Sequence, residues 1–329
     1  MKLLKLIPDN TNIKFLRWRV PFYAVSVLLM AVSLSLVFTK GLNFGVDFIG
    51  GQMVRMTFVE SSEAPVAELR EDIDDLGYGE PIIQQFGQPN EISIRMKLPE
   101  GADANPALAT EMGNRIVSTV QAAYPDARVD GNDTVSGKVS QELAWDGAMA
   151  LALAMLGISI YIWVRFEWQF GIGALFALVH DVTLTLGLFA LTGMEFDLNI
   201  VAALLTLIGY SLNDNIIVYD RIRENLKKFR KMPLPELLDL SVNETLSRTV
   251  VTSVSLLITL VSLLILGPDV IFGFTAAITM GIFVGTYSSI FMSTPILIWL
   301  GVTSDSFVPT ESRADAQVRK ARGQPELEA

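Results

Sequence analysis

The chain has 329 residues, of which 51% are hydrophobic and 18% are charged, and its mean hydropathy is +0.43. This composition is too apolar for an ordinary soluble domain. The net charge of −10 argues against a nucleic-acid-binding protein, and the absence of cysteine excludes disulfides, thiolate metal sites and cysteine nucleophiles.

Six apolar segments approach the length of a membrane span, which takes about 20 residues. They cover residues 20–38, 143–164, 170–191, 198–219, 250–266 and 274–300. The first segment follows Lys14, Arg17 and Arg19, but it is longer than the core of a signal peptide and no small-residue cleavage site follows it. We therefore expect an uncleaved anchor.

The basic residues predict how the chain is oriented. Five lysines and arginines precede the first span, seven lie between 221 and 248, and four follow the last span, whereas the hairpins at 192–197 and 267–269 carry none. Because cytoplasmic segments near spans hold the excess of Lys and Arg, we expect both termini in the cytoplasm. The long insert between the first two spans then faces outward.

These expectations divide the chain into four parts. Residues 1–40 form an N-terminal cytoplasmic segment with the first transmembrane helix, and residues 41–140 form an extracytoplasmic domain. Residues 141–302 hold helices two to six with a cytoplasmic loop at 220–247. Residues 303–329 form a cytoplasmic tail with a composition typical of disorder.

The outward insert has the pattern of an α+β domain. Alternating apolar residues predict strands in GGQMVRMTFVE, PIIQQFG, EISIRMKL and ARVDGNDTVSG. Helical spacing predicts helices in APVAELREDIDDLGY and NPALATEMGNRIVSTVQAAY. The order β-α-β-β-α-β is that of the ferredoxin-like fold. The chain is thus expected to be a membrane protein with six transmembrane α-helices and one ferredoxin-like domain between the first and second.

Polar residues interrupt three of the spans, where a charge costs about 2.5–3.5 kcal/mol on insertion scales. The third span contains His180 and Asp181, and the fourth contains Asn213, Asp214 and Asn215. On the fifth span, helical spacing places five polar residues on one face: Arg248, Thr252, Ser255, Thr259 and Ser262. We expect this face to meet protein or water rather than acyl chains.

Asp214 and Arg248 lie at matching depth. Asp214 is 17 residues from Asp197 and Arg248 is 19 residues from Gly267, which corresponds to about 25 and 28 Å along a helix. An ion pair between them is one interpretation. A purely structural pair, or an Arg248 side chain that reaches the cytoplasmic surface, is the other. His180 and Asp181 could likewise form a relay or simply join helices.

Two further patterns concern packing. Gly281 and Gly285 form a G-x-x-x-G pattern, which lets helices approach closely. Residues 233–246 place apolar side chains on one side and are expected to lie along the inner membrane face.

No motif for ATP or dinucleotide binding occurs, and neither does a metalloprotease or Ser-His-Asp pattern. An enzyme is therefore not expected, and neither is a bound cofactor. A buried carboxylate with titratable and hydroxyl neighbours is typical of a proton path, so protons are the expected coupling ion.

Four motifs resemble a known family. GLNFGVDFIGG (41–51), ALVHDV (177–182), GYSLNDNIIVYDRIREN (209–225) and LSRTVVTS (246–253) are similar to the signature motifs of the SecF family. These proteins are membrane subunits of the bacterial Sec translocase and belong to the resistance-nodulation-division superfamily. The resemblance extends over about 15–302 and includes the six spans with one outward domain.

The resemblance implies a role and several partners. SecF proteins pair with SecD and use proton entry to help draw unfolded preproteins out of the SecYEG channel in the bacterial inner membrane, after the ATP-driven steps. YajC and the YidC insertase are further implied partners. Asp214 matches the aspartate of SLND and Arg248 the arginine of LSRT, and both belong, with Asn213, to the family's proton-responsive site.

The residues and the resemblance also indicate lesser sites. On the residues alone, His180, Asp181 and Thr252 are possible relay residues or helix contacts. Asp47, Gly50 and Gly51 match the junction motif after the first span, where the glycines allow tight turns.

Two other functions remain possible on the residues alone. A small-molecule or lipid exporter of the same superfamily is one, although such exporters usually have two large outward inserts in a longer chain. A passive assembly factor without ion coupling is the other, and it would tolerate a neutral residue at Asp214.

Overall fold

The computed structural model describes residues 8, 11–85, 88–99, 102 and 106–303. The tail that is expected to be disordered lies outside these residues. Within them, six helices are long and apolar enough to cross a membrane, which confirms the predicted spans. Their bounds are Arg19–Thr39 (α1, preceded by the 3-10 turn η1, Phe15–Trp18), Gly137–Arg165 (α5), Trp168–Thr192 (α6), Leu198–Lys228 (α7), Leu234–Leu266 (α8) and Phe272–Ser288 (α9). The last span continues from α9 through the π-helical turn η3 (Ser289–Ser293) into α10 (Thr294–Trp299).

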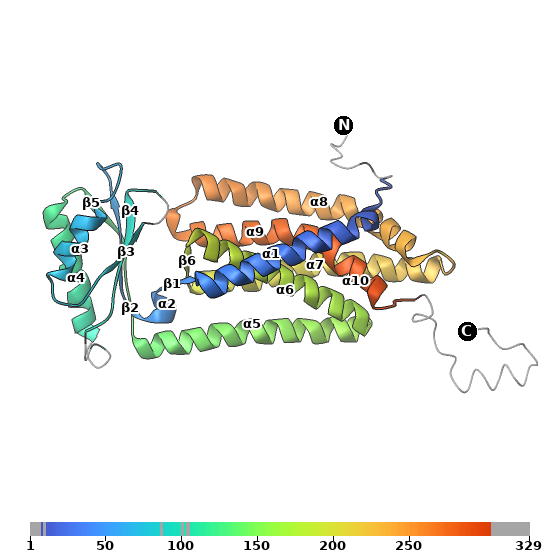
Figure 1. Cartoon of the computed structure of the whole chain (residues 1–329), viewed down its shortest axis with the longest axis horizontal. Coiled ribbons are helices and arrows are strands. Elements are labelled where there is room, and N and C mark those ends of the chain that lie inside the picture. Colours follow the sequence, from blue (N-terminus) through green and yellow to red (C-terminus); the bar gives the residue numbers. More distant parts are fainter. Residues whose placement is uncertain (1–7, 9–10, 86–87, 100–101, 103–105, 304–329) are drawn as a thin grey trace, which may run out of the picture.

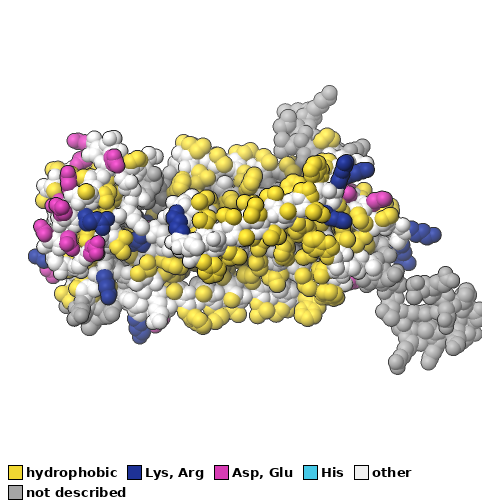
Figure 2. All heavy atoms as spheres, viewed as in Figure 1, with side chains coloured by type: hydrophobic (Ala, Val, Ile, Leu, Met, Phe, Trp, Pro, Cys, Tyr) yellow, Lys and Arg dark blue, Asp and Glu magenta, His cyan; other side chains and the backbone are white. Residues whose placement is uncertain are grey.

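The six long helices run side by side, and the α+β domain between the first two spans caps one end of the bundle (Figure 1). The start of α1 and the short α10 lie at the opposite end. Apolar side chains cover the middle of the bundle, whereas acidic and basic side chains gather on the domain and at the far end (Figure 2). This distribution is what a bilayer around the middle of the bundle requires.

The helices differ in how deeply they are buried within the chain. Most of the apolar window of α6, α7 and α9 is buried, whereas most of the windows of α1, α5 and α8 is not. The core between α6, α7 and α9 contains large side chains such as Phe170, Phe189, Leu207 and Tyr219. The polar residues of the third and fourth spans therefore lie on the two most central helices of the chain.

The α+β domain has the predicted β-α-β-β-α-β order. Its elements are Gly51–Phe58 (β2), Val66–Asp74 (α3), Ile82–Gln85 (β3), Glu91–Met96 (β4), Pro106–Ala123 (α4) and Ala127–Val135 (β5). The strands form one antiparallel sheet in the order β3-β4-β2-β5. In the central pair, Val54 lies opposite Ile94. Alternate strand residues and both helices bury one apolar core, which explains the period-two pattern in the sequence.

A second, very small sheet joins the domain entrance to the membrane helices. Asn43–Phe44 (β1) pairs in parallel with Glu195–Phe196 (β6), a segment of the hairpin between α6 and α7. Between β1 and β2 the chain forms one short helix, Val46–Ile49 (α2). The sequence indicated only a turn at 192–197, so this pairing was not predicted.

Residues 233–246, which are expected to lie along the inner membrane face, form the first part of α8. This helix continues directly into the fifth span. Its buried side packs on α7, where Asn225 donates a 3.0 Å hydrogen bond to the Ser241 hydroxyl. It also contacts the N-terminal region, where the backbone N–H of Leu16 donates to Asp239 at 3.0 Å. Only residues 229–233 connect α7 to α8.

Candidate functional site

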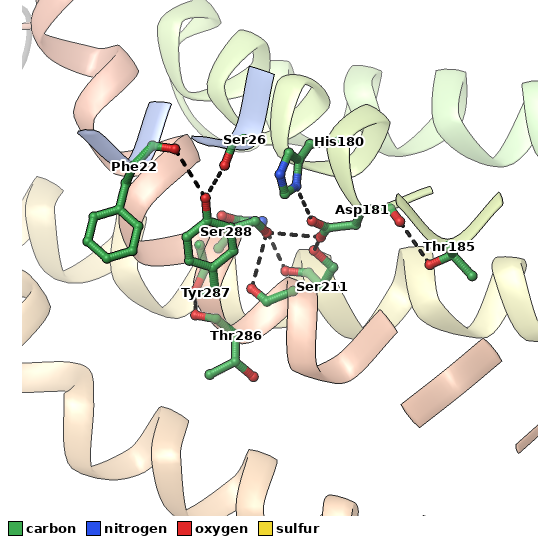
Figure 3. A network of polar contacts seen from close by, with 12 residues as sticks. Phe22, Ser26, His180, Asp181, Thr185, Ser211, Thr286, Tyr287 and Ser288 are labelled. Carbon is green, nitrogen blue, oxygen red and sulfur yellow. Dashed lines mark hydrogen bonds and ion pairs between the residues drawn. The ribbon is translucent and has the colours of Figure 1, made fainter. Parts of the chain in front are cut away.

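A fully buried carboxylate, Asp181 on α6, joins the three central helices. Its Oδ2 accepts hydrogen bonds from the hydroxyls of Ser211 on α7 at 2.6 Å and of Ser288 on α9 at 3.0 Å (Figure 3). Its Oδ1 lies 2.9 Å from Nδ1 of His180, which is also fully buried. The carboxylate is thus surrounded by groups that can donate or exchange a proton. We call His180, Asp181, Ser211 and Ser288 the Asp181 cluster.

The polar contacts continue from the Asp181 cluster toward α1. The His180 ring lies beside the ring of Tyr287, with 5.8 Å between the ring centroids. The Tyr287 hydroxyl contacts the hydroxyl of Ser26 and donates to the carbonyl of Phe22 at 3.4 Å (Figure 3). Nε2 of His180 is buried and has no hydrogen-bond partner within the described part of the chain. The imidazole therefore keeps one nitrogen free for proton exchange.

Glycines bring α7 and α9 close enough to form the Asp181 cluster. A Cβ at Gly281 would lie 2.3 Å from Cδ1 of Leu207, and a Cβ at Gly285 would lie 3.5 Å from Oδ2 of Asp181. The G-x-x-x-G pattern thus has the packing role that the sequence predicted.

Asp214 lies on α7, three residues after Ser211 and therefore about one turn further along the helix. Its side chain is buried, with 1% of the residue exposed. Neither carboxyl oxygen has a hydrogen-bond partner among the described residues. A buried polar group without a partner costs about 1–3 kcal/mol, and more when it is charged. Such a carboxyl is stabilised either by proton uptake or by the approach of a positive charge.

Arg248 is the nearby positive charge, but it does not pair directly with Asp214 in this structure. No ion pair between the two side chains occurs within the described residues, although Arg248 is close enough to act on Asp214 through its charge. Arg248 itself is exposed on α8. The predicted ion pair therefore stays a prediction, and in this conformation both partners are free to change their contacts.

The predicted polar face of α8 is exposed at the surface of this chain. Thr252, Ser255, Thr259 and Ser262 are all exposed. Each hydroxyl donates to a backbone carbonyl four residues earlier, at 2.7 to 3.2 Å. Asn213 on α7 is exposed as well. Thr252 also contacts the hydroxyl of Tyr210 on α7. The exposed hydroxyls further along α8 are accessible to a partner.

Ser211, Ser288 and Tyr287 are the site residues that the sequence did not single out. Ser211 stands three residues before Asp214, and Ser288 lies in a hydroxyl-rich part of the last span. A serine in a membrane helix commonly bonds to its own backbone, as the α8 hydroxyls do. The sequence alone therefore could not show that these two reach Asp181.

The junction motif forms a tight turn at the entrance to the α+β domain. Gly50 has φ of 74° and Gly51 has φ of 129°, both in the region that favours glycine. A Cβ on Gly51 would lie 2.6 Å from the carbonyl oxygen of Met96 on β4. Asp47 accepts a 3.0 Å hydrogen bond from the backbone N–H of Leu198, the first residue of α7. The motif thus contacts both the sheet and a membrane helix.

A bundle of six spans with a buried polar core and one α+β domain after the first span defines a multi-pass membrane protein of the transport class. Residues 115–303 match the family model "Protein export membrane protein SecD/SecF, C-terminal", and residues 35–61 match the "SecD/SecF GG Motif". The chain belongs to the SecD/SecF family of protein-export membrane proteins. It is a transport protein of the bacterial inner membrane and not an enzyme.

Similar proteins agree with this assignment. The protein translocase subunit SecF of Rhodobacter capsulatus is 43% identical over 309 residues, which cover 91% of this chain and 92% of that protein. The SecF subunit of Pseudomonas aeruginosa is 36% identical over 306 residues, with 92% and 96% covered. The crystal structure of SecDF from Thermus thermophilus, a translocon-associated membrane protein, matches with a TM-score of 0.79 at 34% identity. That match covers 90% of this chain and 39% of the SecDF chain.

Proposed function

We propose that this protein acts as the SecF subunit of a SecD–SecF complex that uses proton entry to assist late steps of preprotein export. The observation that carries the proposal is the unpaired, buried carboxyl of Asp214, one turn from the Asp181 cluster on α7. A passive scaffold has no use for a buried carboxyl without partners, because its burial lowers stability. An ion-coupled subunit needs a group of this kind, since proton binding must change its contacts.

Asp214, Arg248 and Asn213 form the proposed proton-coupling site. When Asp214 is ionised, it attracts Arg248 on α8, and when it is protonated, this attraction is lost. In a site with little water, such a change is large enough to shift one helix against another. The Asp181 cluster supplies the proposed relay, because His180 and the two serine hydroxyls can pass a proton between α6, α7 and α9.

The exposed polar face of α8 supports the proposal that SecD lies against this side of the chain. Hydroxyls that bond to their own backbone are tolerated next to lipid, but an exposed Arg248 within a span is better stabilised by a polar partner. We place Asn213 and Thr252 at the same contact. The further partners in the proposal are the SecYEG channel, YajC, the YidC insertase and the unfolded preprotein.

The proposed orientation places both termini in the cytoplasm and the outward domain on the opposite side. The basic residues around the connection between α7 and α8 support it. Helix α7 starts next to the domain entrance, and Lys227, Lys228, Arg230 and Lys231 lie at or just after its other end. The proposed parts of the chain are the segments 1–40, 41–140, 141–302 and 303–329.

Vesicles that contain this protein with SecD and SecYEG test the proposal. A preprotein is pushed part-way by the ATP-driven motor, ATP is then removed, and completion of export is measured under a proton gradient, a sodium gradient or no gradient. We expect completion to depend on the proton gradient and to lose this dependence in Asp214→Asn. The control Asp220→Asn removes an exposed carboxyl from the same helix and should respond as the wild type does.

Equal export by Asp214→Asn and wild type under the proton gradient would favour the passive assembly factor instead. If export is completed only under the sodium gradient, Asp214 remains the proposed coupling residue, but the coupling ion is sodium rather than the proton.

A further inference from the structure

The entrance to the outward domain meets the first turn of α7, the helix that carries Asp214. The two-stranded pairing places Asn43 opposite Glu195 and Phe44 opposite Phe196. Next to it, the backbone N–H of Gly45 donates to the carbonyl of Phe196 at 2.9 Å. The segment that leads into the domain is therefore joined to the last residues before α7 by backbone contacts.

Asp47 extends this contact to α7 itself. Its carboxylate accepts a hydrogen bond from the N–H of Leu198, while Asp197 accepts one from the N–H of Ile200 at 3.1 Å. The first residues of a helix have N–H groups without helical partners, and acidic groups there are stabilised by the helix dipole. Both carboxylates accept a hydrogen bond from an N–H group at the start of α7, but they belong to different segments of the chain. Asp197 belongs to the hairpin before α7, whereas Asp47 comes from the junction motif.

Asp47 is tightly connected to the domain sheet. Only Phe48, Ile49 and Gly50 separate it from β2, which is a central strand of the sheet. The turn between them is closely packed, because a Cβ on Gly51 would meet the carbonyl oxygen of Met96. A displacement of Asp47 therefore reaches the sheet through a few backbone bonds.

Arg95 secures the same junction from the sheet side. This buried residue of β4 donates to the side chain of Asn43 at 2.6 Å and to the side chain of Gln84 at 2.5 Å. It also donates to the carbonyl of Phe44. The sheet thus contacts β1 directly, independently of the chain that runs through the glycine turn.

The other end of this path is the proton-coupling site. Helix α7 is unbroken from Leu198 to Lys228. Asp214 lies 16 residues after Leu198 in the sequence, which corresponds to about 24 Å along the helix. An α-helix keeps its length when it shifts or tilts, so a displacement at Asp214 also moves the N–H of Leu198.

We infer that Asp47 is the positioning residue that couples α7 to the outward domain. Its hydrogen bond to Leu198 transmits the displacement of α7 to the glycine turn and the sheet. The hydrogen bonds of Arg95 to Asn43 and Phe44 keep β1 attached to the sheet during this displacement. The inference rests on the proposed function, because it takes the charge of Asp214 as the cause of the displacement.

Distance measurements between two spin labels test the inference. The protein has no cysteine, so Ser118→Cys on the exposed side of α4 and Val270→Cys on the exposed turn between α8 and α9 give two unique label sites. The distance distribution is recorded in the complex with SecD. We expect Asp214→Asn to shift it, and we expect Asp47→Ala to abolish this shift.

Three matched variants separate coupling from a general loss of structure. Asp47→Asn keeps a side-chain oxygen that can accept the hydrogen bond, so it should restore the shift. Asp197→Ala removes the other acidic cap of α7 and should leave the shift in place. Leu198→Pro removes the donor itself, and proline is well tolerated at the first position of a helix. It should abolish the shift even if Asp47→Ala fails to fold.

The outcomes distinguish the inference from the proposed function. If Asp214→Asn causes no shift in the chain with the native junction, the proposed function fails and the inference fails with it. If the shift occurs there and persists in Asp47→Ala or Leu198→Pro, only the inference is overturned. If Asp197→Ala abolishes the shift as well, the effect is fraying of the helix end, and the inference is likewise overturned.

Discussion

The hydroxyl of Ser211 on α7 donates a 2.6 Å hydrogen bond to Oδ2 of Asp181 on α6. Ser211 stands three residues before Asp214, whose buried carboxyl has no hydrogen-bond partner among the described residues. The carboxyls of Asp181 and Asp214 therefore both affect α7, Asp181 through its hydrogen bond with Ser211 and Asp214 as a residue of the helix one turn further along. A proton gained or lost at one of them changes the contacts of α7 near the other.

The first prediction concerns this hydrogen bond. Ser211→Ala should destabilise the protein by about 1–3 kcal/mol, because it leaves a buried carboxyl with one donor fewer. Thermal unfolding of the purified complex with SecD measures the effect. Thr206→Val is the matched control, since the hydroxyl of Thr206 is exposed on the same helix and bonds only to the carbonyl of Ala202. Equal shifts of the unfolding temperature in both variants would show that Ser211 has no special role.

The second prediction concerns the glycine turn of the junction motif. Gly51→Ala should cost about 1–3 kcal/mol, because φ of 129° is strained for alanine and the new Cβ would meet the carbonyl of Met96. Gly157→Ala provides the contrast. Nothing lies within 4 Å of a Cβ there and the residue is inside helix α5, so alanine should be neutral or slightly stabilising. Unfolding of both variants under identical conditions gives the comparison, and a neutral Gly51→Ala would refute the strained turn.

The sequence predicted those parts of the structure that depend on local patterns. Span positions follow from runs of apolar residues, and the β-α-β-β-α-β order follows from alternation and helical spacing, so both were confirmed. The pairing of β1 with β6 could not be predicted, because two-residue strands 152 positions apart leave no periodic signal. The packing of the first turns of α8 on α7 was not predicted, because an apolar side packed on another helix has the same pattern as one that faces the membrane surface.

Part of the candidate functional site was also predictable from a local sequence pattern. A charge inside an apolar run is conspicuous in the sequence, which drew attention to His180, Asp181 and Asp214. Whether two such groups meet depends on helix packing. Asp181 has hydrogen-bond contacts with three neighbours, whereas the Asp214 carboxyl has none with the residues that the structure describes.

The third prediction concerns the pH dependence of the junction. Burial raises the pKa of Glu195, against the opposing charges of Arg95 and Arg55, and the nearby Asp197 and Asp47 raise it further. A carboxyl with a raised folded pKa contributes stability below its unfolded pKa of about 4.3 and loses it as the pH rises through the folded value. The wild type should therefore lose stability relative to Glu195→Gln between about pH 4 and neutrality. Unfolding temperatures measured across this range test the prediction, and a constant difference between the two proteins would contradict it.

The fourth prediction concerns orientation. Because the chain has no cysteine, single cysteines report their side of the membrane without background. Ser62→Cys in the outward domain should react with a membrane-impermeant thiol reagent in cells whose outer barrier has been opened. Lys228→Cys at the end of α7 should react only after the inner membrane is permeabilised. Both residues are exposed, so burial does not confuse the result. Labelling of Lys228→Cys in sealed cells would reverse the orientation.

The central claim is that Asp214 itself takes up and releases a proton while the complex works. Infrared difference spectroscopy of the reconstituted complex, recorded as the pH is stepped across the range in which export responds to the gradient, detects the carbonyl band of a protonated carboxyl directly. The account predicts a band that appears in the wild type and in Asp220→Asn and is missing in Asp214→Asn. A band of unchanged intensity in Asp214→Asn would contradict the account, because the proton would then be bound elsewhere.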